Sequence, residues 1–242
     1  LGAAARRWAV PAGAITYAMV PVTWDYGTSG LENGLTMAWL GGSYLALALY
    51  LAVDLPLERR DWRHYGVAAL VGLGPLVRPE LALFSVAFAA PLLVRAWGQW
   101  RAGSLQARRL MEYVAAAVAI PVAYEFWRMG YFAAVVPNTA IAKSAFEARW
   151  QQGWYYTQNF FGFYLLAVPL LILATHWLAT VTGLFRDGAT ARAVALVSPV
   201  LAGIGEAFYL VRMGGGFMHG RLFLPALFGM LLPVAVIGVR GE

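Results

Sequence analysis

The sequence has no cysteine, so disulfide bonds, thiolate metal sites and thiol chemistry are excluded. Charged residues are scarce: they form 12% of the 242 residues, against about a quarter in a typical soluble domain. Because 61% of the residues are hydrophobic, the composition argues against a water-soluble protein. Lysine is almost missing too, since Lys143 is the only one among 18 basic residues.

Long apolar runs take up most of the chain, and several approach the roughly 20 residues that a helix needs to cross a bilayer. The runs are continuous rather than alternating, which favours helices over a β-barrel. We therefore predict an all-α polytopic membrane protein, with residues 1–242 forming a single transmembrane domain. About eight membrane segments are expected, at 8–24, 34–53, 65–76, 81–94, 113–131, 161–181, 191–211 and 222–239.

The net charge of +6 could suggest a nucleic-acid partner, but the positions of the basic residues indicate membrane topology instead. If the first segment runs outward, twelve basic residues face the cytoplasm, as the positive-inside rule requires. The lipid bilayer is then the expected partner, and nucleic acid is not. The twelve are Arg6, Arg7, Arg59, Arg60, Arg63, Arg95, Arg101, Arg108, Arg109, Arg186, Arg192 and Arg240.

The chain begins at Leu1 without an initiator Met, and no signal-peptide cleavage site precedes the first apolar run. We expect an internal fragment whose N-terminal part is missing. Part of the active site is then expected upstream of Leu1.

Four polar patches fall on the outer side in this topology, and the first is TSGLENG at 28–34, shortly after Asp25. One interpretation is a helix cap with Glu32 in the first turn, stabilised by the helix dipole. The other makes Glu32 or Asp25 a carboxylate that faces a sugar, as a base or as a hydroxyl acceptor. The sequence leaves both open.

The second and third patches combine cations with helix breaks. Arg78 and Glu80 flank a proline, and they form either a structural ion pair or a site where Arg78 binds a phosphate that Glu80 helps to orient. The segment PNTAIAKS at 137–144 contains Asn138 and Lys143, and a compact ammonium is a common phosphate ligand. A lysine that reaches to lipid headgroups is the alternative for Lys143.

The fourth patch, RMGGGFMHGR at 212–221, joins the last two segments. His219 is either a hydrogen-bonded loop residue or a base, and Arg221 suits phosphate or carboxylate recognition. We expect Glu125 and Arg128 to form an internal ion pair, whereas Glu206 lies inside an apolar segment and needs a partner that the sequence does not name. No cluster has the spacing of a zinc site, so no metal site is predicted, although a carboxylate-held divalent cation is left open as a cofactor.

Taken in order, these four patches resemble bacterial polytopic glycosyltransferases of the GT-C type. The stretches PNTAIAKSAFEARWQQGWYY and FMHGRLFLP are most similar to the actinobacterial arabinofuranosyltransferases that add terminal β-(1→2)-linked residues. The resemblance implies a GT-C-like helix bundle in the plasma membrane and an inverting transfer on the extracytoplasmic face. It also implies decaprenyl-phosphoryl-arabinofuranose as donor and the arabinan of arabinogalactan or lipoarabinomannan as acceptor.

Two departures from the family pattern bear on the site. The catalytic base is expected upstream of Leu1, and the family's Gly-Gly-Asp reads Gly-Gly-Gly here, with Gly216 in place of the acid. Three alternatives stay open: transfer of another polyprenyl-linked sugar such as mannose, transport of lipid-linked sugars, and a purely structural membrane subunit. A transporter predicts ionisable residues near the bilayer midplane and repeated halves.

Overall fold

The computed structural model describes residues 7–53, 55–133 and 148–240. In this part of the chain, five helices are long and apolar enough to cross a membrane. The 20 residues of α3 alone span about 30 Å at 1.5 Å per residue, which matches the hydrocarbon core of a bilayer. The prediction of an all-α polytopic membrane protein is confirmed. The five are α3 (Asn33–Ala52), α6 (Ala82–Arg101), α7 (Ala107–Phe132), α10 (Ala167–Arg186) and α11 (Thr190–Met213).

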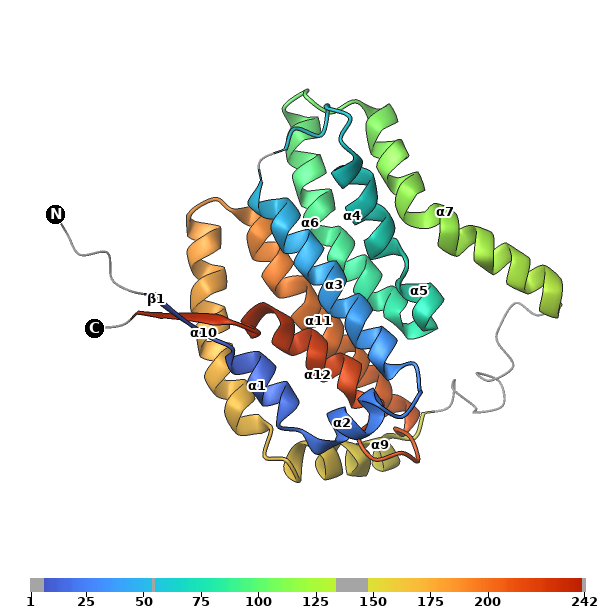
Figure 1. Ribbon diagram of the computed structural model, residues 1–242, viewed down its shortest axis with the longest axis vertical. Helices are drawn as coiled ribbons and strands as arrows, with labels where there is room; N and C mark the ends of the chain where they lie inside the picture. Colours follow the sequence, from blue (N-terminus) through green and yellow to red (C-terminus); the bar gives the residue numbers. More distant parts are fainter. Residues whose placement is uncertain (1–6, 54, 134–147, 241–242) are drawn as a thin grey trace.

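The centre of the bundle is formed by α3, α6 and α11, with α12 (Phe223–Leu231) packed between α3 and α11 (Figure 1). Phe84 and Phe88 of α6 are fully buried against Leu40 and Leu47 of α3. A second apolar core surrounds Phe223 of α12. On opposite sides of this centre, α10 and α7 form the flanks (Figure 1).

Helix ends gather at two ends of the molecule. At the top of Figure 1 lie the C-terminal ends of α3, α6 and α10 and the N-terminal ends of α4 (Trp62–Gly72), α7 and α11. These ends and their loops carry nine of the arginines predicted to face the cytoplasm, at 59–63, 95–109 and 186–192, and we call this the basic end. The opposite end carries the patches at 28–33, 78–80 and 212–221.

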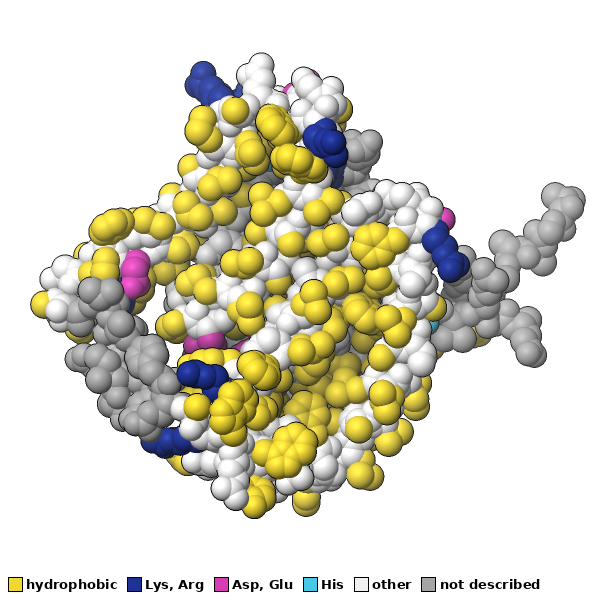
Figure 2. All heavy atoms as spheres, turned by 180° about the vertical axis from the view of Figure 1, so that it is seen from behind, with side chains coloured by type: hydrophobic (Ala, Val, Ile, Leu, Met, Phe, Trp, Pro, Cys, Tyr) yellow, Lys and Arg dark blue, Asp and Glu magenta, His cyan; other side chains and the backbone are white. Residues whose placement is uncertain are grey.

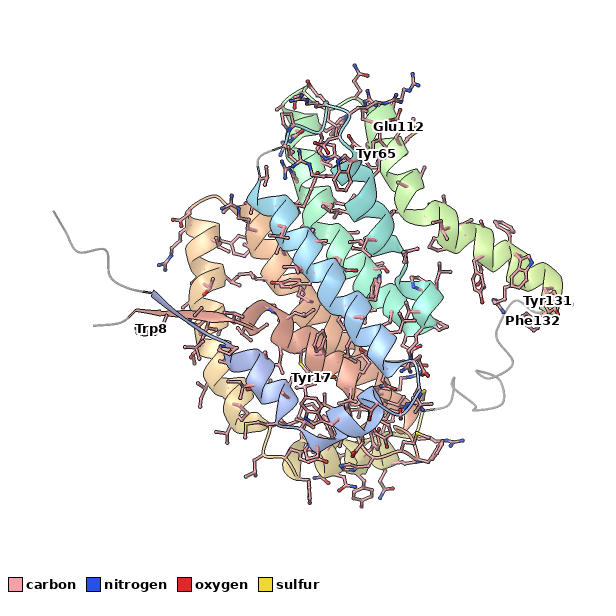
Figure 3. The ribbon with its side chains drawn as sticks, in the orientation of Figure 1. Trp8, Tyr17, Tyr65, Glu112, Tyr131 and Phe132 are labelled. Atoms are coloured by element: carbon pink, nitrogen blue, oxygen red, sulfur yellow. The ribbon has the colours of Figure 1, made fainter. Side chains whose placement is uncertain are left out.

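At the basic end, Tyr65 of α4 and Glu112 of α7 lie next to each other (Figure 3). The Tyr65 hydroxyl donates a hydrogen bond of 2.7 Å to Oε2 of Glu112, and Arg109 contacts the same oxygen at 2.9 Å. From this contact α7 runs away from the bundle and is exposed over most of its length. It changes direction on the way (Figure 1), and its interior Pro121, which cannot donate the helical hydrogen bond, accounts for the bend.

The first and last predicted membrane segments are not single helices, and these two predictions were wrong. Residues 8–24 form β1 (Arg7–Val10), α1 (Ala12–Ala18) and α2 (Pro21–Gly27), because Pro11 and Pro21 interrupt the backbone pattern of one helix. Residues 222–239 are divided between α12, η3 (Leu232–Val234) and β2 (Ile237–Arg240). The strands β1 and β2 pair antiparallel, with Arg7 opposite Arg240.

The segments at 65–76 and 81–94 form a helical hairpin. Between α4 and α6 the chain makes α5 (Gly74–Val77) and the 3₁₀ turn η1 (Pro79–Leu81). Arg78 between them is extended, with φ −154° and ψ 139°, as expected of a residue that precedes a proline. The segment predicted at 161–181 begins later, because α9 (Trp150–Thr157) continues into the π-helical turn η2 (Gln158–Gly162) before α10 starts.

The surface has the distribution expected of a membrane protein. Figure 2 shows hydrophobic side chains over most of the middle of the molecule, with arginine side chains near its margins. Large apolar side chains such as Val86, Leu171 and Phe208 are exposed on three different helices. Exposed apolar surface this extensive is stable in lipid and would aggregate in water.

Candidate functional site

Three of the outer patches meet at the end opposite the basic end. Glu32 precedes α3, Arg78 lies between α5 and η1, and Arg221 precedes α12. Oε1 of Glu32 lies 2.7 Å from Nη2 of Arg221 and 3.5 Å from Nη1 of Arg78. One carboxylate therefore binds two arginines that come from distant parts of the sequence, and we call these side chains and their direct partners the arginine network.

Each arginine has a second partner. Arg78 pairs with Glu80 across Pro79, which confirms their predicted proximity. Nε of Arg221 donates a hydrogen bond of 3.1 Å to Oδ1 of Asn33. Glu206 of α11 is buried, and its carboxyl lies within electrostatic range of Arg78 and Glu80, but its Oε2 makes no hydrogen bond with the described residues.

The contacts favour a role for Glu32 in holding the arginines. Burial alone would raise the pKa of Glu32, but a backbone hydrogen bond and the charges of Arg78 and Arg221 outweigh it and lower that pKa. Glu32 is the N-cap residue of α3, yet its side chain makes no capping hydrogen bond. Its carboxylate is therefore charged at neutral pH and engaged by cations, which makes it a weak base.

Several hydrogen-bond donors in the network lack a strong acceptor. Nδ2 of Asn33 and Nη1 of Arg78 are buried and make no hydrogen bond with the described residues, although Nη1 of Arg78 lies 3.5 Å from Oε1 of Glu32 in an ion pair. Nη1 of Arg221 faces only the sulfur of Met218, at 3.2 Å, and a thioether is a weak acceptor. A buried donor without a partner costs about 1–3 kcal/mol. An anion with several oxygens would satisfy all three.

The loop at 214–222 is fixed by α9. The Tyr156 hydroxyl donates to the carbonyl of Met218 at 2.9 Å and accepts from the amide of Leu222 at 3.3 Å. Gly153 lets α9 lie directly on α11, because a Cβ there would be 1.8 Å from the carbonyl oxygen of Val211. The aromatic-rich helix α9 is thus the support of the loop that carries Arg221.

His219 lies outside the arginine network. Its Nε2 is 3.2 Å from the hydroxyl of Tyr164, and the rings of Phe160 and Phe163 flank it. Asp25 of α2 lies within electrostatic range of Tyr164. The structure therefore separates the predicted residues into two groups, one around Glu32 and one around His219.

Sequence reasoning assigned no role to Tyr156 or Tyr164. Tyr156 ends the stretch that carries the family resemblance and Tyr164 lies in no motif, and the roles of both depend on a loop distant in sequence; only the density of aromatic residues in this region was a signal. Asn138 and Lys143 lie outside the described residues. The predicted ion pair between Glu125 and Arg128 is confirmed, with Nε of Arg128 3.0 Å from Oε2 of Glu125.

Within 7–53, 55–133 and 148–240, no three acidic or histidine side chains meet in an arrangement that could hold a metal ion. The divalent cation stays a prediction.

Comparison with known proteins adds a relationship that the geometry alone does not give. The chain is 38% identical to the terminal β-(1→2)-arabinofuranosyltransferase of Mycobacterium tuberculosis over 95% of its length, and 36% identical to the protein of the same name from Corynebacterium glutamicum over 96%. The chain is a relative of these two transferases. It spans 38% and 36% of their respective lengths, just over a third. No family model and no solved structure matches the chain.

Proposed function

We propose that this chain is part of an inverting membrane glycosyltransferase that moves arabinofuranose from decaprenyl-phosphoryl-arabinofuranose to cell-wall arabinan. The acceptor is the arabinan of arabinogalactan or lipoarabinomannan, and the reaction takes place on the extracytoplasmic side of the plasma membrane. The observation that carries the proposal is the arginine network at the end opposite the basic end. The similarity to two arabinofuranosyltransferases supports the choice of sugar.

The network suits the phosphate of such a donor. Phosphate oxygens accept hydrogen bonds from guanidinium and amide groups, and Arg78, Asn33 and Arg221 each present an N–H that has no strong hydrogen-bond acceptor among the residues that the structure describes. The two guanidinium charges equal the carboxylate charges of Glu32 and Glu80, so this group recognises an anion by directed donors rather than by excess positive charge.

The reaction breaks the bond between the anomeric carbon and the phosphate oxygen. An acceptor hydroxyl oxygen attacks the anomeric carbon from the opposite side, its proton passes to a carboxylate base, and the bonding electron pair leaves with the lipid phosphate. Arg78 and Arg221 stabilise the negative charge that develops on the leaving phosphate. The base is expected upstream of Leu1; Asp25 is the free candidate in this chain, because Glu32 is engaged by two arginines.

The experiment is a transfer assay with the full-length protein in lipid nanodiscs, a radiolabelled decaprenyl-phosphoryl-arabinofuranose donor and a short arabinan acceptor. A β-(1→2)-linked product that is lost in Arg78→Gln and retained in Arg186→Gln, at the basic end, is the expected result. Absence of product from this donor, together with product from a mannose donor, would move the assignment to another sugar. Movement of the donor across the bilayer without any product would favour a transporter.

A further inference from the structure

A second group of side chains lies beside the arginine network, and the proposed reaction gives it no role apart from Asp25 as a candidate base. His219 is at its centre, with its ring 5.8 Å from that of Tyr164 and 6.3 Å from that of Phe163. Burial and the nearby negative charge of Asp25 raise the pKa of Tyr164, which lies outside the membrane helices. A carboxylate, a phenol, an imidazole and an aromatic ring are thus gathered at the surface of one end.

The loop holds this group at a fixed separation from the arginine network. His219 and Arg221 flank Gly220, whose φ of +64° favours glycine. A Cβ on Gly220 would lie 2.4 Å from the ring of Phe160, so the backbone of the loop packs directly against that ring. Tyr156 binds the backbone of this loop at two points. His219 and Arg221 are only two residues apart, yet they belong to different groups, and the fold of this loop sets the distance between the two groups.

The chemistry of the two groups differs. The arginine network presents N–H donors, which suit an anion. The second group presents the carboxylate of Asp25 as an acceptor, the hydroxyl of Tyr164 and the ring nitrogen of His219 as donors or acceptors, and the ring of Phe163, whose exposed fraction is 73%. Sugar hydroxyls pair with the first three, and the C–H face of a sugar packs against the negative face of an aromatic ring.

We propose that Asp25, Phe163, Tyr164 and His219 bind the acceptor glycan, a neutral furanose oligosaccharide, next to the donor phosphate at the arginine network. The inference rests on the proposed function for its biological role. A membrane anchor would account for Phe163 alone, because aromatic rings collect at the interface, but it gives no role to the carboxylate and imidazole beside it.

The experiment measures binding and kinetics on the full-length protein in nanodiscs. A fluorescently labelled linear arabinofuranose hexasaccharide is titrated without donor, and the KM values for acceptor and donor are measured separately. We expect Asp25→Asn and Phe163→Leu to raise the Kd and the acceptor KM about tenfold, and Tyr164→Phe to raise both about threefold. The donor KM stays within twofold. Phe185→Leu, an exposed aromatic at the other end of α10, is the matched control and leaves all values unchanged.

Each outcome separates this inference from the proposed reaction. Wild-type binding that the three substitutions weaken supports the glycan site, whether or not product is formed. Product formation with unchanged Kd and acceptor KM in all three variants overturns the glycan site and leaves the reaction standing. Wild-type protein that fails to bind the hexasaccharide at millimolar concentration also overturns it, and so does an equal loss of affinity in Phe185→Leu.

Discussion

Replacement of Arg221 by lysine keeps the positive charge and removes the shape of the guanidinium. Arg221 directs Nη2 to Glu32 at 2.7 Å, Nε to Asn33 at 3.1 Å and Nη1 to Met218 at 3.2 Å. Lysine has three donors on one nitrogen and cannot span these three acceptors. We expect Arg221→Lys to lose the contact with Asn33 and to weaken the one with Glu32.

The magnitude follows from those contacts. A hydrogen bond to a charged group contributes about 1.5–3 kcal/mol and a neutral one about 0.5–1.5 kcal/mol. Because the Glu32 side chain is 38% exposed, solvent screening reduces the first figure. We therefore expect a loss of about 1–2 kcal/mol in stability. A similar loss in donor binding, about 1.4 kcal/mol, raises the donor KM about tenfold.

The assay compares Arg221→Lys with Arg186→Lys, an exposed arginine at the basic end of α10. Thermal midpoints and donor KM are measured on the full-length protein in nanodiscs. Arg221→Lys lowers the midpoint and raises the donor KM with the acceptor KM unchanged, whereas Arg186→Lys changes neither. Equal behaviour of the two variants would refute the assignment of Arg221 to the donor phosphate.

Three further substitutions test the same end of the molecule. Because the pKa of Glu32 is lowered in the folded protein, its contribution to stability is complete above its ordinary value of 4.5 and is lost as pH falls through the folded value. Glu32→Gln should therefore lower the thermal midpoint at pH 7, and a gap between variant and wild type that does not narrow as pH falls below 4.5 contradicts this. Tyr156→Phe removes a hydroxyl with two backbone partners and should cost about 1 kcal/mol and speed amide exchange in 214–222; unchanged exchange would rule it out as the support of the loop. Gly216→Asp should fold normally, because φ is not positive there and the added Cβ meets only the flexible end of Leu222, at 2.9 Å; a misfolded variant would show that glycine is required.

The sequence predicted the fold class and the local pairs, because both depend on short-range signals. Apolar runs of about 20 residues identify membrane helices whatever they pack against, and all five long helices were found in this way. Pro79 forces the chain to break between Arg78 and Glu80, so their proximity follows from three residues. The membrane segments predicted at the two ends of the chain were wrong. At 8–24, the high apolar content suggested one helix although Pro11 and Pro21 indicate breaks.

The arginine network could not be predicted as a geometry. Glu32 and Arg221 are 189 positions apart, and their contact depends on how α3 and α12 pack together. The sequence assigned the four patches to one side of the membrane. Hydropathy and charge predict only how deep a residue lies in the membrane and on which side, not which residues contact one another. His219 and Arg221 belong to different groups because of the backbone conformation at Gly220 and the ring of Phe160 against which it packs, and no sequence pattern encodes either feature.

The single lysine of the chain gives a last prediction. In the network the charges of Arg78 and Arg221 are balanced by Glu32 and Glu80, so a phosphate that binds there adds a negative charge without a counterion. Lys143 is predicted from the sequence to supply that charge, and a compact ammonium needs no fixed direction to do so. We expect Lys143→Gln to raise the donor KM about tenfold and Lys143→Arg to restore most of the affinity, both measured in the transfer assay. If Lys143→Gln retains the wild-type donor KM, directed hydrogen bonds from the network are sufficient, and the charge balance does not limit donor binding.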